Sequence, residues 1–150
     1  SSVETVARRF RPGPHRRTVV ADHQGVRYVD DSKATNPHAA LAAVGDFPSV
    51  VLIAGGIAKG LDISPLARHP HVRFVVAMGE AADQLLVSGG APGARAASME
   101  EAVAMAAKAA AVGDTVLLAP GCASFDMFAS YGARGDAFSA AVLAMMEDSK

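Results

Sequence analysis

The sequence has 150 residues, of which 51% are apolar and 19% charged, and its formal net charge is −1. This length fits one self-supporting domain. The near-zero charge gives no electrostatic basis for binding nucleic acid or an anionic membrane. A single cysteine, Cys122, excludes a disulfide framework and a cysteine-rich zinc site, as is typical of a cytoplasmic protein. The longest apolar runs are far shorter than the roughly 20 residues of a membrane helix.

The first residues resemble an inter-domain linker. Residues 1–14 contain no Met and end in a stretch rich in Arg and Pro. We expect this segment to be the remnant of a linker to a preceding domain, and we expect residues 15–150 to form the domain itself.

The first half of the chain predicts a hairpin followed by a helix and a buried strand. Two short runs rich in Val and Tyr, Arg17–Ala21 and Val26–Val29, flank residues with turn chemistry. Asn36-Pro37 is typical of a helix start, since Asn caps a backbone N–H and Pro fits the first turn. The helix is expected over His38–Val44, and the apolar run Val50–Ala54 predicts a strand buried on both faces.

The second half alternates apolar runs with Ala-rich segments, and Ser98-Met99-Glu100-Glu101 forms a capping box that predicts a helix start. Strands are expected over Val72–Met78 and Thr115–Ala119. Helices are expected over Ser64–Arg68, Glu80–Val87, Ser98–Ala111 and Ala133–Met146, with a loop over Pro120–Ser130. Strands that alternate with helices predict an α/β fold, here a Rossmann-like three-layer domain with a mostly parallel sheet, helices on both faces and an N-terminal β-hairpin.

Three polar loops follow strand ends, over 30–36, 55–62 and 121–131. Ligands of open parallel sheets bind beyond the carboxyl ends of the strands, so we expect these loops to share one rim. The first loop reads Asp-Asp-Ser-Lys-Ala-Thr-Asn. Its pair Asp30 and Asp31 fits an acid–base pair, a metal site or simply a solvated turn. The five histidines lack ligand spacing, and we assign no metal site.

The other two loops each allow a structural and a functional interpretation. Gly55-Gly56-Ile57-Ala58-Lys59-Gly60 matches neither phosphate-binding glycine motif, and the chain lacks a Walker A loop. The loop is either a tight turn, or it presents Lys59 to a carboxylate or phosphate as a compact charge. Ser124 is expected to cap a helix, which would also create an anion site. Cys122 is expected to be a small packed residue rather than a nucleophile.

Together these loops resemble the C-terminal domain of the Mur ligases, in the branch that adds D-glutamate. The resemblance rests on Asp31-Ser32-Lys33-Ala34-Thr35-Asn36, on Gly55-Gly56-x-x-Lys59, on Pro120-x-Cys122-Ala123-Ser124-Phe125-Asp126 and on Pro14-His15-Arg16. These motifs stand in family order and span nearly the whole chain. The resemblance implies an ATP-dependent ligase of peptidoglycan synthesis in the bacterial cytoplasm.

The resemblance also implies a role for individual residues. Thr35 and Lys59 would bind one carboxylate of D-glutamate, and Ser124, Phe125 and Tyr131 would bind the other. The positions facing ATP would be Arg16, Asp31 and Lys33. The metal ion, Mg²⁺, would be held mainly by a central domain that this chain lacks, and UDP-N-acetylmuramoyl-L-alanine would be the second substrate. No catalytic residue or general base is assigned, and the chain alone is expected to be inactive.

Two alternatives remain from the sequence. The Ser-Lys-Ala-Thr motif argues against a related Mur-type or folylpolyglutamate ligase. The Asp-Asn-Pro-Arg signature of the diaminopimelate-adding enzyme is absent from the sequence. A free-standing, non-catalytic ligand-binding module is favoured by the missing phosphate-binding loop, whereas the linker-like start argues for a domain of a longer enzyme.

Overall fold

The computed structural model describes residues 14–124 and 126–149. Its centre is a six-stranded sheet with the order β1-β2-β6-β3-β4-β5. β1 pairs with β2 in antiparallel fashion, and all other pairs are parallel. The strands are β1 (Thr18–His23), β2 (Val26–Asp30), β3 (Val50–Gly55), β4 (Val72–Met78), β5 (Gly93–Arg95) and β6 (Thr115–Leu118). The predicted mostly parallel sheet with an N-terminal hairpin is therefore confirmed.

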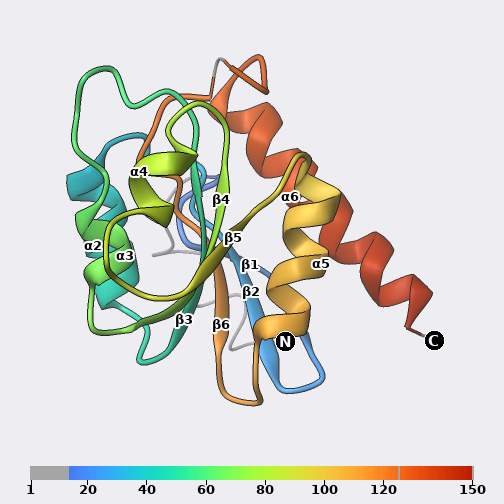
Figure 1. Ribbon diagram of the computed structural model, residues 1–150. Coiled ribbons are helices and arrows are strands. Elements are labelled where there is room, and N and C mark those ends of the chain that lie inside the picture. The colour runs from blue at the N-terminus through green and yellow to red at the C-terminus, as the bar shows by residue number, and fades with distance from the viewer. Residues whose placement is uncertain (1–13, 125, 150) are drawn as a thin grey trace.

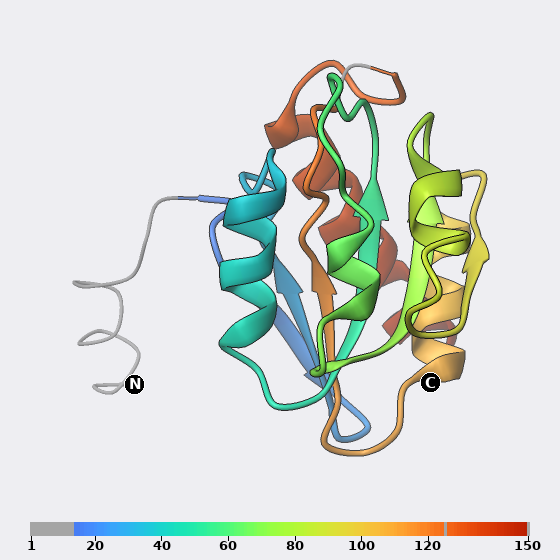
Figure 2. The same cartoon turned by 60° about the vertical axis from the view of Figure 1, so that its left-hand side comes forward.

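Helices cover both faces of the sheet, as predicted (Figures 1 and 2). One face carries α2 (Pro37–Gly45), α3 (Pro65–Arg68) and α4 (Ala82–Leu86), and the other carries α5 (Met99–Ala109) and α6 (Tyr131–Asp148). Successive residues of a strand point to opposite faces, so Leu52 joins the core under α2 whereas Ile53 joins the core under α5 and α6. Both side chains are fully buried.

The predicted helix starts are mostly confirmed. The Asn36 side chain accepts a hydrogen bond from the Ala39 amide at 2.9 Å, with Pro37 in the first turn. Ser98 accepts from the Glu101 amide at 3.1 Å. The Glu101 carboxylate reaches back to the Ala97 amide at 2.9 Å, which completes the cap one residue earlier than in the standard box.

Several elements differ from the prediction, and α4 begins at Ala82, two residues later than expected. The strand β5 was not predicted, because it has only three residues, Gly93–Arg95, and no apolar run. The last helix begins at Tyr131, two residues earlier than expected, because Ser130 caps it by accepting from the Ala133 amide at 3.0 Å.

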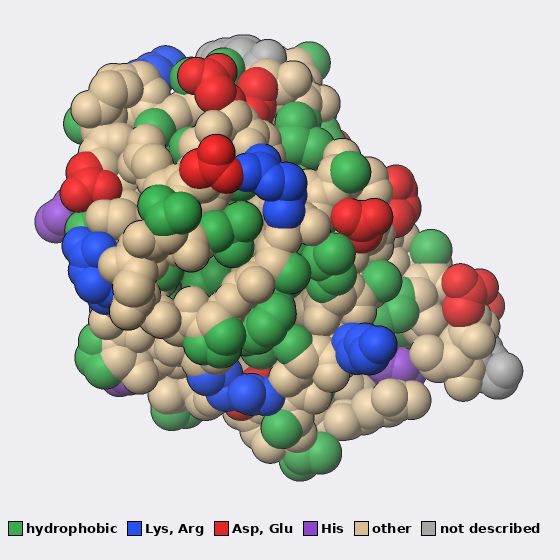
Figure 3. Space-filling model, viewed as in Figure 1, with side chains coloured by type: hydrophobic (Ala, Val, Ile, Leu, Met, Phe, Trp, Pro, Cys, Tyr) green, Lys and Arg blue, Asp and Glu red, His purple; other side chains and the backbone are tan. Residues whose placement is uncertain are grey.

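On one face of the molecule, charge is spread rather than gathered. On the face shown in Figure 3, Lys and Arg side chains lie among Asp and Glu side chains. Within the described residues, no helix is long and apolar enough to cross a bilayer. Because charges of both signs are mixed on the face in Figure 3, they do not indicate a binding surface there. The polar loops at the strand ends are the better candidates for a binding site.

Candidate functional site

The three polar loops lie at the same edge of the sheet, at the top of Figure 2. β2, β6 and β3 are parallel neighbours, so their carboxyl ends meet there. The loop after β2 leads into α2, the loop after β3 leads towards α3, and the loop after β6 leads into α6. The predicted common rim is present, at the edge where parallel sheets bind ligands.

Backbone hydrogen bonds join the three loops into one surface. The Gly121 amide donates to the Ala34 carbonyl at 2.9 Å, which ties the third loop to the first. Ile57 and Ala123 form an antiparallel bridge with bonds of 2.9 and 3.0 Å, which ties the second loop to the third. Each loop is therefore fixed by the others rather than by its own sequence alone.

The glycines of the second loop permit close packing. A Cβ at Gly55 would lie 2.0 Å from the Met78 carbonyl oxygen, and one at Gly56 would lie 2.3 Å from that of Ala123. The Gly55 amide donates to the Pro120 carbonyl at 3.0 Å. Because these groups are used within the protein, the tight-turn interpretation holds for Gly55 and Gly56, and Lys59 remains the candidate anion ligand of this loop.

The residues predicted to bind D-glutamate flank these loop contacts. Thr35 follows Ala34 and is half-buried, whereas Lys59 is exposed and has a left-handed backbone with φ of 53°. Ser124 is 3% exposed, and Tyr131 is 39% exposed at the start of α6. Phe125 lies outside the described residues. The predicted set thus comes from all three loops, although its role in binding stays a prediction.

The residues predicted to face ATP are neighbours. Arg16, Asp31 and Lys33 line one open hollow of about 290 Å³ beside α2, together with Arg17. Three cations around one carboxylate suit an anionic ligand such as a polyphosphate. Arg17, which sequence reasoning did not select, forms an ion pair of 2.6 Å with Asp46 at the end of α2.

The acidic pair is buried, so it is not a solvated turn. Asp30 and Asp31 are 2% and 4% exposed. The Asp30 carboxylate lies 2.7 Å from His15 Nδ1 and accepts from the Ser32 amide at 2.9 Å. Asp31 accepts from the Arg17 amide at 3.1 Å. Burial raises the pKa of Asp31, against the lowering effects of the Arg17 amide and charge.

These contacts fasten residues 15–17 onto the first loop. The Lys33 amide adds a third bond, to the His15 carbonyl at 3.0 Å. Gly135 of α6 makes the room, because a Cβ there would lie 2.3 Å from His15 Nδ1. His15 stood in the motif Pro14-His15-Arg16 without an assigned role, and the structure shows that it holds Arg16 beside Lys33.

Arg134 is the residue that sequence reasoning missed. Its guanidinium is buried and donates to the Ser32 hydroxyl at 2.9 Å, the Ser32 carbonyl at 2.8 Å and the Cys122 carbonyl at 3.0 Å. The Ser32 hydroxyl in turn donates to the Tyr131 carbonyl at 2.7 Å. Burial lowers the pKa of Arg134 to about 10, so it stays charged at neutral pH. The sequence signal that could have identified Arg134 is a charged residue at a buried position of the last helix.

The third loop corrects one prediction and agrees with another. Ser124 does not cap a helix: its carbonyl accepts from the amides of Met127 and Phe128 in a turn, and Ser130 caps α6 instead. Cys122 is 1% exposed, and burial raises its pKa to about 12. It is a small packed residue, as expected, and not a thiolate nucleophile.

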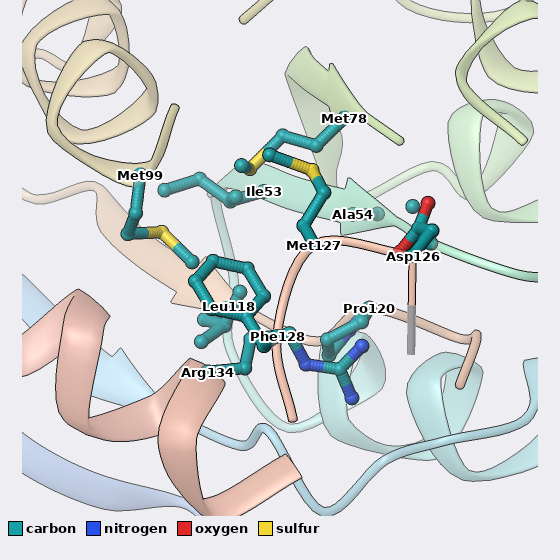
Figure 4. A pocket seen from close by; sticks show the side chains of 12 residues that line it. Ile53, Ala54, Met78, Met99, Leu118, Pro120, Asp126, Met127, Phe128 and Arg134 are labelled. Carbon is teal, nitrogen blue, oxygen red and sulfur yellow. The ribbon is translucent and has the colours of Figure 1, made fainter. Parts of the chain in front are cut away.

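A small pocket lies behind this loop, on the side of α5 and α6 (Figure 4). Its walls are mainly apolar and include Met78, Met99 and Met127, while Asp126 and Arg134 add charge at its edge. Among residues 14–124 and 126–149, no three His, Cys, Asp or Glu side chains group as a ligand set for a metal ion.

The comparisons with known proteins agree with the motifs. The family of Mur ligase glutamate ligase domains matches residues 15–122. A UDP-N-acetylmuramoylalanine--D-glutamate ligase of Frankia casuarinae is 52% identical over 142 residues, covering 90% of this chain and 30% of that protein. The enzyme of the same name from Thermobifida fusca is 47% identical, covering 96% of this chain and 34% of that protein. The chain thus spans about a third of these relatives.

Among solved structures, a bifunctional folylpolyglutamate synthase/dihydrofolate synthase from Yersinia pestis, complexed with AMPPNP and Mn ion, has a TM-score of 0.59. It is 21% identical and covers 91% of this chain and 32% of its own, so this likeness shows the fold alone. The family match covers most of the chain, in agreement with the resemblance of the motifs. The chain therefore belongs to the Mur ligase family, as its C-terminal, glutamate ligase domain.

Proposed function

We propose that this chain is the D-glutamate-binding domain of an ATP-dependent ligase that joins D-glutamate to UDP-N-acetylmuramoyl-L-alanine. The observation that carries the proposal is the convergence of Thr35, Lys59 and Ser124 on three hydrogen-bonded loops at the carboxyl edge of the sheet. The relatives named for this reaction are 52% and 47% identical, which supports the same substrates. A location in the bacterial cytoplasm is part of the proposal.

The reaction runs through an acyl phosphate. The carboxylate of UDP-N-acetylmuramoyl-L-alanine attacks the γ-phosphorus of ATP, and ADP leaves. The neutral amine of D-glutamate then attacks the acyl carbon, forming a tetrahedral intermediate that expels phosphate and loses the amine proton. This chain contributes by positioning the amine and by placing cations near the transferred phosphoryl group.

Each carboxylate of D-glutamate needs fixed donors, because desolvating a carboxylate without partners is costly. The Lys59 ammonium and the Thr35 hydroxyl supply one set, and the third loop supplies the other through Ser124, Phe125 and Tyr131. The Ser124 side chain is buried, so its hydroxyl has already lost most of its contact with water before a substrate binds. The two carboxylates of D-glutamate are thus held by different loops, and this fixes the direction in which its amine points.

ATP would lie against the hollow lined by Arg16, Asp31 and Lys33. The chain has no Walker A loop, so the principal phosphate and Mg²⁺ contacts belong to a central domain of the full-length ligase. Mg²⁺ would neutralise the phosphates when bound there. The proposal therefore includes that this chain alone does not turn over.

The decisive experiment is steady-state kinetics of the full-length ligase with the Lys59→Ala variant. Loss of a charge-assisted hydrogen bond should raise the KM for D-glutamate by about 10- to 100-fold. The KM values for ATP and for the nucleotide substrate should stay close to wild type. Arg68→Ala, a change in another exposed cation of the same sheet face, is the matched control.

A substrate screen separates this proposal from a folylpolyglutamate-type ligase. The wild-type enzyme should ligate D-glutamate and reject L-glutamate. Ligation of L-glutamate to a folate, or an unchanged KM for D-glutamate in Lys59→Ala, would disprove the assignment.

A further inference from the structure

Asp126 ends the third motif, and the proposed function gives it no role. Its side chain is exposed, yet one carboxylate oxygen accepts a hydrogen bond from the Glu80 backbone amide at 2.8 Å. Gly79 makes this approach possible, because a Cβ there would lie 2.3 Å from the same oxygen. The carboxylate thus spans from the loop after β6 to the loop after β4, two segments 46 residues apart in sequence.

The Asp126 hydrogen bond and the Ala123 backbone bonds fix the chain on both sides of Ser124. On one side, Ala123 is bound through both its amide and its carbonyl to Ile57. On the other side, the Ser124 carbonyl holds the following turn by accepting from the Phe128 amide at 2.9 Å. Asp126 lies within that turn and is the only side chain of it for which a described hydrogen bond reaches another loop. Ser124 is therefore placed between two fixed points.

The loop after β4 is a shared anchor for both other loops. The next amide, that of Ala81, donates to the Gly56 carbonyl at 2.9 Å. Glu80 and Ala81 thus hold the Ser124 loop and the Lys59 loop with successive amides. Figure 4 shows both Asp126 and Arg134 at the pocket behind this loop, and Arg134 holds the same loop at the Cys122 carbonyl. Besides the Ile57–Ala123 bridge, the Asp126 contact thus gives a second link between the Ser124 loop and the Lys59 loop, through Glu80 and Ala81.

We propose that Asp126 is a positioning residue for D-glutamate, which sets the distance between Ser124 and Lys59 through its hydrogen bond to the Glu80 amide. The inference rests on the proposed function. A direct role in binding is unfavourable, because a carboxylate beside the dianionic substrate repels it. The role of Asp126 is geometric, so a neutral oxygen acceptor at the same place preserves it.

The test compares three variants of the full-length ligase. Asp126→Ala removes the acceptor and should raise the KM for D-glutamate by about 10- to 100-fold, since small misplacements of binding groups are costly. Asp126→Asn retains an oxygen acceptor without the charge and should restore the KM to near wild type. Glu101→Ala is the matched control, because Glu101 also accepts from a backbone amide, that of Ala97, in a region far from the rim loops.

Several outcomes would overturn the inference. An unchanged KM for D-glutamate in Asp126→Ala does so, as does an equal loss in Asp126→Ala and Asp126→Asn. A fall in melting temperature larger than that of Glu101→Ala, with equal increases in all KM values, would show a merely structural role. If the wild-type enzyme itself fails to ligate D-glutamate, the proposed function fails instead, and the two results are distinguished by that first measurement.

Discussion

The guanidinium of Arg134 lies 2.9 Å from the hydroxyl of Ser32, so α6 is joined to the loop after β2 across 102 positions of sequence. The same guanidinium binds the Cys122 carbonyl in the loop after β6. One buried cation therefore fixes two of the three loops that carry the proposed substrate ligands. This arrangement explains how loops of irregular backbone keep a single geometry.

Replacing Arg134 should destabilise the domain strongly. Arg134→Ala leaves the carbonyls of Ser32 and Cys122 without donors, and each buried unsatisfied group costs about 1–3 kcal/mol. We expect a loss of about 3–5 kcal/mol in the free energy of unfolding, measured by urea denaturation of the chain. Arg95→Ala, which breaks only the exposed pair with Asp83, should cost less than about 1 kcal/mol. Equal losses in the two variants would contradict the assigned role.

Asp114 should give the domain an acid-sensitive contribution to stability. Burial alone would raise its pKa, but hydrogen bonds from the Ala111 amide, Ser49 and Arg73 outweigh it, and the pKa lies below the ordinary value of 3.8. The fold therefore favours the ionised form, whose contribution is present above pH 3.8 and is lost as the pH falls through the lower folded pKa.

The measurement for Asp114 is the free energy of unfolding of the wild type and of Asp114→Asn as a function of pH. The wild type should be the more stable protein near neutral pH, and the difference should shrink towards zero as the carboxyl becomes protonated. A difference that stays constant down to about pH 2 would contradict the assigned pKa direction.

His69 should give a second pH dependence, at higher pH. Burial and the neighbouring charge of His71 lower the pKa of His69 below 6.5. Its Nδ1 accepts from the His71 amide at 3.0 Å, which requires an unprotonated nitrogen. The folded state thus favours neutral His69, and this contribution to stability is present above pH 6.5 and lost as the pH falls below it. His69→Gln should abolish that part of the pH dependence in unfolding measurements, and an unchanged profile would refute the assignment.

The strands that form the sheet interior were predictable because they are continuous apolar runs. β4 matches its prediction at both ends, and β3 and β6 each differ from theirs by one residue. β5 was not predictable, because an edge strand with half-exposed or exposed residues carries no apolar signal. Its pairing with β4 is decided by tertiary contacts rather than by propensity.

The site was predictable in its location but not in its internal supports. The motif residues and their common rim follow from strand order and loop chemistry. The hydrogen-bond partners of Arg134, His15 and Asp126 could not be predicted in this way, because each contact joins segments that are at least 12 positions apart in the sequence. Ser124 was misassigned as a helix cap because Ser130, six residues later, has the same capping chemistry and is the residue at which α6 begins.

Cys122 should be unreactive in the native domain. Burial raises its pKa to about 12, and its side chain is 1% exposed, so neither a thiolate nor access for a reagent is available. A thiol-specific disulfide reagent at about pH 8 should label the folded chain only at the rate of its unfolding, and should label one thiol per chain at once in guanidinium. Arg134→Ala, which removes the donor to the Cys122 carbonyl and loosens this loop, should speed labelling of the folded state. Rapid labelling of the native wild type would show that the loop opens without global unfolding, and the rigid rim described above would then be wrong.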